Sequence, residues 1–168
     1  MEKELYGDKA LEKIRELIKD IDIGMLTTYG IDGGLHSRPM SSNRDVQGDG
    51  TTWFFTRRNS RLVDEIKENT EVHLTFNNTA KHIYVSVLGE AVLIEDKALM
   101  KEHWKPELNT WFKEGLKDPE LLLIRVTMKE GEYWEVQDHF LAHTLNFARS
   151  IAGKDPSDMT EHGIAKPH

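Results

Sequence analysis

The stretch TTWFFTRRNSRLVDEI, residues 51–66, changes its repeat halfway along. Its first six residues are β-branched or aromatic, as is typical of a strand, whereas Leu62 and Ile66 recur at the spacing of one helix face. Asn59 and Ser60 stand between the two halves, and both are residues that favour the start of a helix. We therefore expect a strand that passes through a short loop directly into a helix.

The junction between this strand and this helix has the features of an anion site. Free backbone N–H groups and the positive end of a helix dipole attract negative charge, and we expect the Ser60 hydroxyl to face the same place. Arg61 in the first helical turn is slightly unfavourable unless an anion is bound there. A phosphate monoester would suit these donors, although the phosphate motifs GxxxxGK[ST] and GxGxxG do not occur.

The upstream stretch LHSRPMSS, residues 35–42, resembles a strand with two unsuitable residues. Arg38 carries a charge that is costly to bury, and Pro39 lacks the N–H group that a β-ladder uses. We interpret the pair as ligand-binding. If this strand forms a hairpin with the strand at 51–56, Arg38 reaches the same anion, on a strand face shared with His36.

Charge and composition narrow the class of protein. The net charge of −7 argues against general nucleic-acid binding, which depends on a basic surface. The absence of cysteine excludes disulfides, thiolate nucleophiles and cysteine-based metal sites. Five of the eight arginines nevertheless fall within one window of 24 residues: Arg38, Arg44, Arg57, Arg58 and Arg61.

Runs with a two-residue repeat follow one another along the chain. Turn sequences such as YGIDGG, QGDG, NNT and KEG separate several of them. This pattern predicts about six or seven strands, and the short turns favour a mainly antiparallel sheet of the kind that can close into a barrel. Gly89, inside the run IYVSVLGEAVLI, predicts a bulge at a barrel corner. The predicted fold class is mainly β, of the α+β kind, with flanking helices.

Apolar residues spaced three and four apart predict helices around the strands. One opens the chain at residues 8–21, another begins at Asp96, and a last one covers residues 140–153. We expect one compact domain, with the barrel in residues 1–137 and a C-terminal helix and tail in residues 138–168. The charged N-terminal segment predicts neither a signal peptide nor a membrane span, so we expect a cytoplasmic protein.

The motifs HSRPM, GDGTTWFFT, NSRLVDEI, YVSVLGEA, HWKPELNTWF, DPELLLIRV and EYWEV occur in an order that resembles the pyridoxamine 5'-phosphate oxidase-like flavoproteins, in particular the general stress protein 26 branch. The resemblance implies a Greek-key split β-barrel that binds FMN and forms a homodimer, with the flavins at the subunit interface. It places the phosphate at Arg38, Ser60 and Arg61. The residues that it assigns to the cofactor are Arg38, Pro39, Met40, Phe55, Thr56, Ser60, Arg61, Trp104 and Trp111.

The resemblance implies an FMN-dependent oxidoreductase, in which NAD(P)H reduces the flavin and the flavin reduces an unidentified small molecule. One alternative is a protein that binds, stores or senses flavin without turnover, and another is a split barrel that binds deazaflavin or haem. Many members carry lysine where this chain has Arg61. The ending EHGIAKPH lacks the arginines that pyridoxamine phosphate oxidases use for their substrate, so we do not expect that activity.

Several residues have structural interpretations as well. Trp53 is expected in the core, and the aromatic rings of Trp104 and Trp111 suit a subunit interface as well as a flavin. His139 and His143 have the HxxxH spacing of a zinc site, but Phe140 stands where a zincin has its glutamate, so no metal site is expected.

Overall fold

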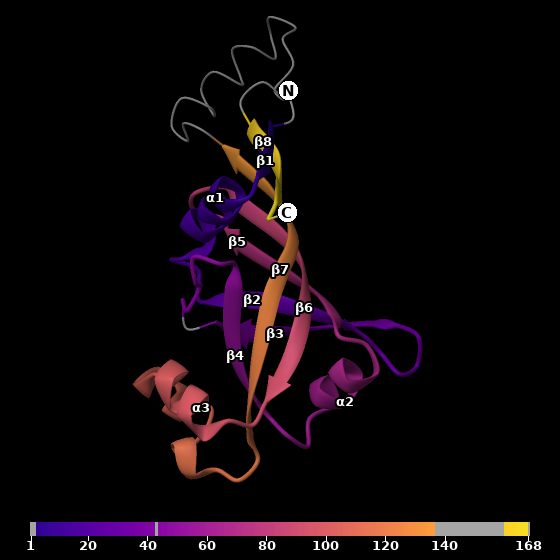
Figure 1. Ribbon diagram of the computed structural model, residues 1–168, viewed down its shortest axis with the longest axis vertical. Coiled ribbons are helices and arrows are strands. Elements are labelled where there is room, and N and C mark those ends of the chain that lie inside the picture. Colours follow the sequence, from indigo (N-terminus) through magenta and orange to yellow (C-terminus); the bar gives the residue numbers. More distant parts are fainter. Residues whose placement is uncertain (1–2, 43, 137–159, 168) are drawn as a thin grey trace, which may run out of the picture.

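The computed structural model describes residues 3–42, 44–136 and 160–167 (Figure 1). This part of the chain contains eight strands, three α-helices and two short 3-10 helices. The strands are β1 (Lys3–Tyr6), β2 (Ile23–Tyr29), β3 (Leu35–Ser41), β4 (Thr51–Arg57), β5 (Glu71–Asn78), β6 (Ile83–Ile94), β7 (Leu121–Val136) and β8 (Thr160–Lys166). The helices are α1 (Asp8–Ile18), α2 (Arg61–Glu68), α3 (Lys97–His103), η1 (Pro106–Thr110) and η2 (Gly115–Lys117).

The strands form one mixed sheet in the order β1-β8-β7-β6-β5-β2-β3, and β4 pairs with β7 outside this path. All pairings between the named strands are antiparallel except the parallel pairing of β1 with β8. The sheet curls strongly and does not close (Figure 1). Its high strand content and mainly antiparallel pairing confirm the predicted mainly β split-barrel class. No helix in the described ranges is both long and apolar enough to cross a membrane.

Strand β7 organises the sheet because it is shared by three neighbours. Its 16 residues pair with β6 along most of their length, with β4 at the N-terminal end and with β8 at the C-terminal end. The prediction of two separate runs with a KEG turn between them was wrong. The β6 ladder continues through Glu130 and Gly131, and the extra residue Lys129 is taken up by a bulge opposite Leu88 and Gly89.

The predicted hairpin between the strands at 35–41 and 51–57 was also wrong. Strand β3 pairs with β2, from Ile23 opposite Ser41 to Tyr29 opposite Leu35, whereas β4 pairs with β7. The reason lies in burial: residues 51–56 are buried on both strand faces, so β4 needs a partner in the interior, and the apolar start of β7 provides it. The YGIDGG turn does form the expected hairpin, between β2 and β3.

Both ends of the described chain add strands that the repeat pattern did not predict. Strand β1 precedes the first helix, and β8 lies between β1 and β7. The predicted helix at residues 140–153 lies outside the described residues.

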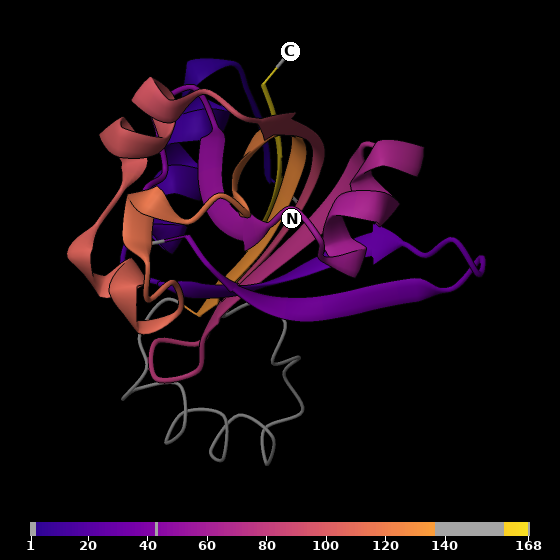
Figure 2. The ribbon, with the colours of Figure 1, turned by 90° about the horizontal axis from the view of Figure 1, so that it is seen from below.

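Strand β4 separates two hydrophobic clusters, and this division positions the candidate site. Phe54 faces the main core, which includes Leu26 and Tyr133 and is flanked by α1. Phe55 faces a second cluster formed with Met100 and the residues of the 106–117 segment. Figure 2 shows α2 near one end of the β2–β3 hairpin, with α3 and the 3-10 helices on the other side of β4.

The predicted bulge at Gly89 is confirmed by the register shift between Leu88 and Gly89. A Cβ atom at Gly89 would lie 2.8 Å from Val126 Cγ1 and 3.0 Å from the carbonyl oxygen of Thr127. Neither a buried side chain nor a backbone carbonyl moves aside easily. We expect Gly89→Ala to lower the free energy of unfolding by about 1–3 kcal/mol in urea titrations.

Gly48→Ala is the control for this substitution, because a Cβ atom at Gly48 meets nothing within 4 Å. Its effect should stay within about 0.5 kcal/mol. Equal effects of the two substitutions would show that the bulge imposes no steric requirement at Gly89.

Candidate functional site

A cavity of about 370 Å³ opens between β3, the end of β4 and the 106–112 segment. Its volume is in the range of about 300–1,000 Å³ that is usual for small-molecule sites. Most of the wall is apolar or aromatic, and hydroxyl groups and one guanidinium provide the polar contacts. The lining residues are Ile23, Pro39, Met40, Ser41, Phe55, Thr56, Arg57, Ser60, Leu108, Trp111 and Phe112.

Six of the nine residues assigned to a cofactor from the sequence line this cavity: Pro39, Met40, Phe55, Thr56, Ser60 and Trp111. Pro39 fits here because β3 is an edge strand of the described sheet, where the missing N–H group costs little. The structure places Arg38, Arg61 and Trp104 outside the lining.

The junction of β4 and α2 forms one end of the cavity. Ser60 is the N-cap of α2 with extended backbone angles, yet its side chain makes no capping hydrogen bond. Its hydroxyl instead lies 3.2 Å from Oγ1 of Thr56, and both residues line the cavity. The predicted path from strand through a short loop to helix is therefore correct, and the Ser60 hydroxyl lies at the cavity wall.

Arg38 meets an anion, but that anion belongs to the protein. Its Nη2 donates to Oε2 of Glu65 at 2.6 Å, and its Nη1 donates to the Thr28 hydroxyl at 2.6 Å. The Thr28 hydroxyl in turn donates to the same Glu65 oxygen at 2.6 Å. Arg38 reaches α2 across the β2–β3 hairpin and does not depend on the predicted pairing of β3 with β4.

Glu65 is the polar residue that sequence reasoning missed. It is fully buried on the packed side of α2. Its second oxygen, Oε1, lies 2.8 Å from Nε of Arg61; the two groups form an ion pair, but their geometry is not that of a hydrogen bond. Burial alone would raise the pKa of its carboxyl. The hydrogen bonds from Thr28 and Arg38, with the charges of Arg38 and Arg61, outweigh this effect and hold the pKa below its ordinary value.

A signal for Glu65 was present in the sequence. It follows Arg61 by four residues, the spacing at which two helical side chains meet, and it precedes Ile66 on a helix whose other buried residues are apolar. Arg57 was missed as a lining residue, although it directly follows Thr56 and belongs to the arginine window. Its nearest acid is the nearly buried Asp118, with 3.8 Å between Nη2 and Oδ2.

Arg61 also contacts the turn of the β2–β3 hairpin. Its Nη2 lies 3.1 Å from Oδ2 of Asp32 and 2.8 Å from Nε2 of His36. His36 shares the partly covered face of β3 with Arg38, as the alternation predicted. The two arginines predicted to bind phosphate therefore both lie against carboxylates.

The aromatic residues divide between core and cavity. Trp53 is buried, as predicted, and its ring stacks on His103 with 3.9 Å between ring centroids. Trp104 packs edge-on against Phe55 at 5.2 Å, behind the cavity wall. Trp111 lines the cavity and is 65% exposed, so it forms part of the mouth.

Comparison with known families identifies this architecture. A family model described as pyridoxamine 5'-phosphate oxidase like matches residues 9–158. The chain belongs to this family. The resemblance inferred from the ordered motifs is therefore confirmed, including its general stress protein 26 branch.

Named relatives span most of the chain. Protein bli-3 of Neurospora crassa is 26% identical over 170 residues, covering 96% of this chain and 81% of bli-3. The structure of general stress protein 26 from Bacillus anthracis is 28% identical with a TM-score of 0.64, covering 73% of this chain and 92% of that one. The general stress FMN/FAD binding protein from Xanthomonas citri is 27% identical with a TM-score of 0.67, covering 79% and 93%. A general stress protein 26 structure from a Jannaschia species, 21% identical, shares the fold with a TM-score of 0.74 and coverage of 94% and 98%.

The lowered pKa of Glu65 predicts a pH-dependent contribution to stability. A carboxyl whose pKa is lower in the folded state than in the unfolded state stabilises the fold at pH values above its ordinary pKa, here 4.5. This contribution is lost as the pH falls through the pKa of the folded state. Glu65→Gln keeps the shape and removes the charge. We expect wild type to exceed this variant by about 1–3 kcal/mol in free energy of unfolding at pH 7, and the difference to disappear in acid.

Glu68→Gln, on the exposed side of the same helix, controls for the loss of one charge. The measurement is urea unfolding at a series of pH values between 7 and 3. A difference between wild type and Glu65→Gln that stays constant with pH would contradict the assigned role of the charged carboxylate.

Proposed function

We propose that this chain is a flavoprotein that binds FMN in the cavity between β3, β4 and the 106–112 segment and acts as an oxidoreductase. The observation that carries this proposal is the composition of the cavity. Apolar and aromatic walls from Pro39, Met40 and Phe55 meet, at one end, the Ser60 hydroxyl and the start of α2. A flat ring with an anionic tail requires these two surfaces side by side.

The phosphate end of the ligand would be held at the start of α2. Ser60 supplies a hydroxyl at the cavity wall, and the first helical turn supplies backbone N–H groups. Arg61 follows directly, and Arg38 is joined to it through Glu65. Arg57 lines the same end and adds a third guanidinium.

The ring end would lie against Pro39, Met40, Phe55 and Thr56, with Trp111 at the mouth. FMN supplies the hydride and electron chemistry when bound, while the protein orients the ring and tunes its electronics. The apolar wall excludes water from one ring face. We propose NAD(P)H as the electron donor and a small molecule as the acceptor.

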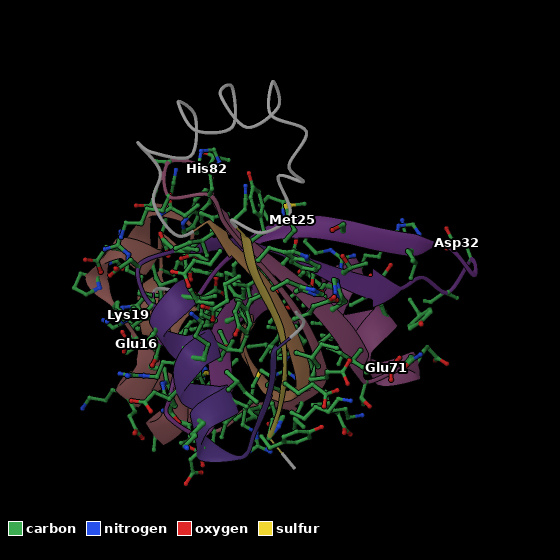
Figure 3. All side chains as sticks on the ribbon, turned by 90° about the horizontal axis from the view of Figure 1, so that it is seen from above. Glu16, Lys19, Met25, Asp32, Glu71 and His82 are labelled. Atoms are coloured by element: carbon green, nitrogen blue, oxygen red, sulfur yellow. The ribbon has the colours of Figure 1, made fainter. Side chains whose placement is uncertain are left out.

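Two copies of the chain would complete the site. The outer side of the β2–β3 hairpin, called the hairpin face below, exposes apolar residues without cover from the described chain (Figure 3). Exposed apolar surfaces of this kind mark protein interfaces. Ile23 and Pro39 belong both to the hairpin face and to the cavity, so a partner packed there would also enclose the ligand. The hairpin face carries Ile23, Met25, Tyr29, Leu35 and Pro39.

The visible spectrum of the purified protein and mass spectrometry of the released ligand test this proposal. Bound FMN would support it, and failure to bind added FMN or a related flavin would refute it. Consumption of NADH or NADPH by the loaded protein then separates an enzyme from a flavin store. A deazaflavin or haem in the released ligand would keep the fold and replace the cofactor.

Ser60→Ala tests the phosphate end of the site. The substitution removes one hydrogen bond to a charged group, so we expect FMN affinity to fall by about tenfold. Riboflavin lacks the phosphate, and its affinity should not change. Fluorescence titration measures both ligands.

Stability controls for Ser60→Ala follow from the structure. Since the Ser60 side chain makes no capping bond, the free energy of unfolding should change by less than about 0.5 kcal/mol. Equal losses for FMN and riboflavin would remove Ser60 from the phosphate site.

Met25→Asp tests the hairpin face as the contact between copies. Met25 is 38% exposed, and a charge at this position would be buried without a partner in a dimer. We expect light scattering to give twice the 19.4 kDa chain mass for wild type and the single mass for Met25→Asp, with weakened FMN binding.

Val92→Asp is the matched control, because Val92 is 40% exposed and lies on β6, away from the hairpin face. It should leave the mass unchanged. A monomeric wild type that binds FMN normally would show that the site needs no second copy.

A further inference from the structure

The turn of the β2–β3 hairpin brings a carboxylate to Arg61, one of the arginines of the proposed phosphate end. Asp32, at the tip of the hairpin in Figure 3, has Oδ2 3.1 Å from Nη2 of Arg61. Its other oxygen lies 2.9 Å from Nε2 of His36, which itself lies 2.8 Å from the same arginine nitrogen. Arg61 thus has a carboxylate and an imidazole on the outward side of its guanidinium group.

The local backbone holds Asp32 in this position. The N–H group of Gly34 donates to Oδ1 at 3.1 Å, which closes a small turn around the side chain. This bond, with those from His36 and Arg61, lowers the pKa of Asp32 to about 2. The carboxylate is therefore charged at neutral pH and already oriented toward the arginine.

Gly30 leaves the room that this arrangement needs. A Cβ atom at Gly30 would lie 2.4 Å from Oδ1 of Asp32 and 2.6 Å from Nε2 of His36. Both contacts are with ends of side chains, so a methyl group at Gly30 would push these groups aside without moving the backbone. The position of the Asp32 carboxylate can therefore be changed by a substitution at Gly30, without changing its charge.

The two carboxylates near the arginines differ in their freedom to move. Glu65 is fully buried between Arg38 and Arg61 and has no route to solvent. Asp32 is 58% exposed, so its side chain can turn away from Arg61 into water. Of the two, only Asp32 can yield its place to an incoming anion.

We propose that Asp32 acts as an internal anion that occupies the Nη2 end of Arg61, so that a phosphate monoester must displace it in order to bind this arginine. Asp32 thereby sets the affinity of the site for the phosphate end of a ligand. The identity of that ligand as FMN rests on the proposed function above. The competition between Asp32 and a phosphate group can be tested without flavin.

Asp32→Asn tests the proposal with FMN and riboflavin. The asparagine keeps the shape and can still accept from the Gly34 N–H group, but it loses the charge that opposes a dianionic phosphate. We expect FMN to bind about three- to tenfold more tightly than to wild type, whereas riboflavin affinity stays the same. Fluorescence titration at low salt gives both values.

Two further variants separate this effect from a general change in charge or fold. Asp49 accepts from the backbone N–H group of Thr51 at 3.0 Å, so Asp49→Asn removes the same charge from a similar turn in another loop. It should leave FMN affinity unchanged. Gly30→Ala, which displaces Asp32 and keeps its charge, should tighten FMN binding in the same direction as Asp32→Asn.

Inorganic phosphate is the probe that works without flavin. In an NMR titration with phosphate, we expect the backbone amide signals of residues 60–62 to shift at about three- to tenfold lower phosphate concentration in Asp32→Asn than in wild type.

The outcomes separate this inference from the proposed function. If wild type binds FMN and Asp32→Asn binds it no more tightly, the inference is overturned and the proposed function stands. Tighter phosphate binding by Asp32→Asn in a chain that binds no flavin would support the internal anion and overturn the flavin assignment. Phosphate binding by neither protein would overturn the inference as well.

Discussion

The buried carboxylate of Glu65 is the constraint around which the candidate site is arranged. A charge sealed from water must be matched by partners at hydrogen-bond distance, and these come from two different elements of the fold. Thr28 and Arg38 reach it from the β2–β3 hairpin, and Arg61 reaches it from its own helix. The hairpin and α2 are thereby fixed to each other, next to the junction of β4 and α2 that forms the polar end of the cavity.

The features of the fold that follow from local sequence could be predicted, and those that depend on distant partners could not. The change of repeat within residues 51–66 correctly predicts β4 followed by α2, since neighbouring residues determine it. The pairing of β4 with β7 joins segments about seventy residues apart and is decided by burial on both faces of β4. The same applies to KEG, residues 129–131: the local sequence predicts a turn, but pairing with β6 keeps the strand continuous and leaves a bulge at Lys129.

The site shows the same division between local and distant information. Thr56 and Ser60 lie within one strand-loop-helix unit. The physics of a helix start suffices to predict an anion site at Ser60, whereas Thr56 was assigned only through the family resemblance. Leu108 and Phe112 reach the cavity only because the second hydrophobic cluster brings their segment against Phe55. Arg38 was expected to bind a ligand phosphate, and the structure pairs it with the Glu65 carboxylate of the same chain. This contact depends on how the β2–β3 hairpin packs on α2, which the local sequence does not determine.

The parallel pairing of β1 with β8 has a consequence for the order of folding. Residues 3–6 pair with residues 163–166, so each pair joins positions 160 residues apart in the sequence. Within the described sheet β1 has no other neighbour, so its ladder cannot form before β8 is in place. Because the entropy cost of closing a loop grows with its length, this ladder should be among the last parts of the sheet to form.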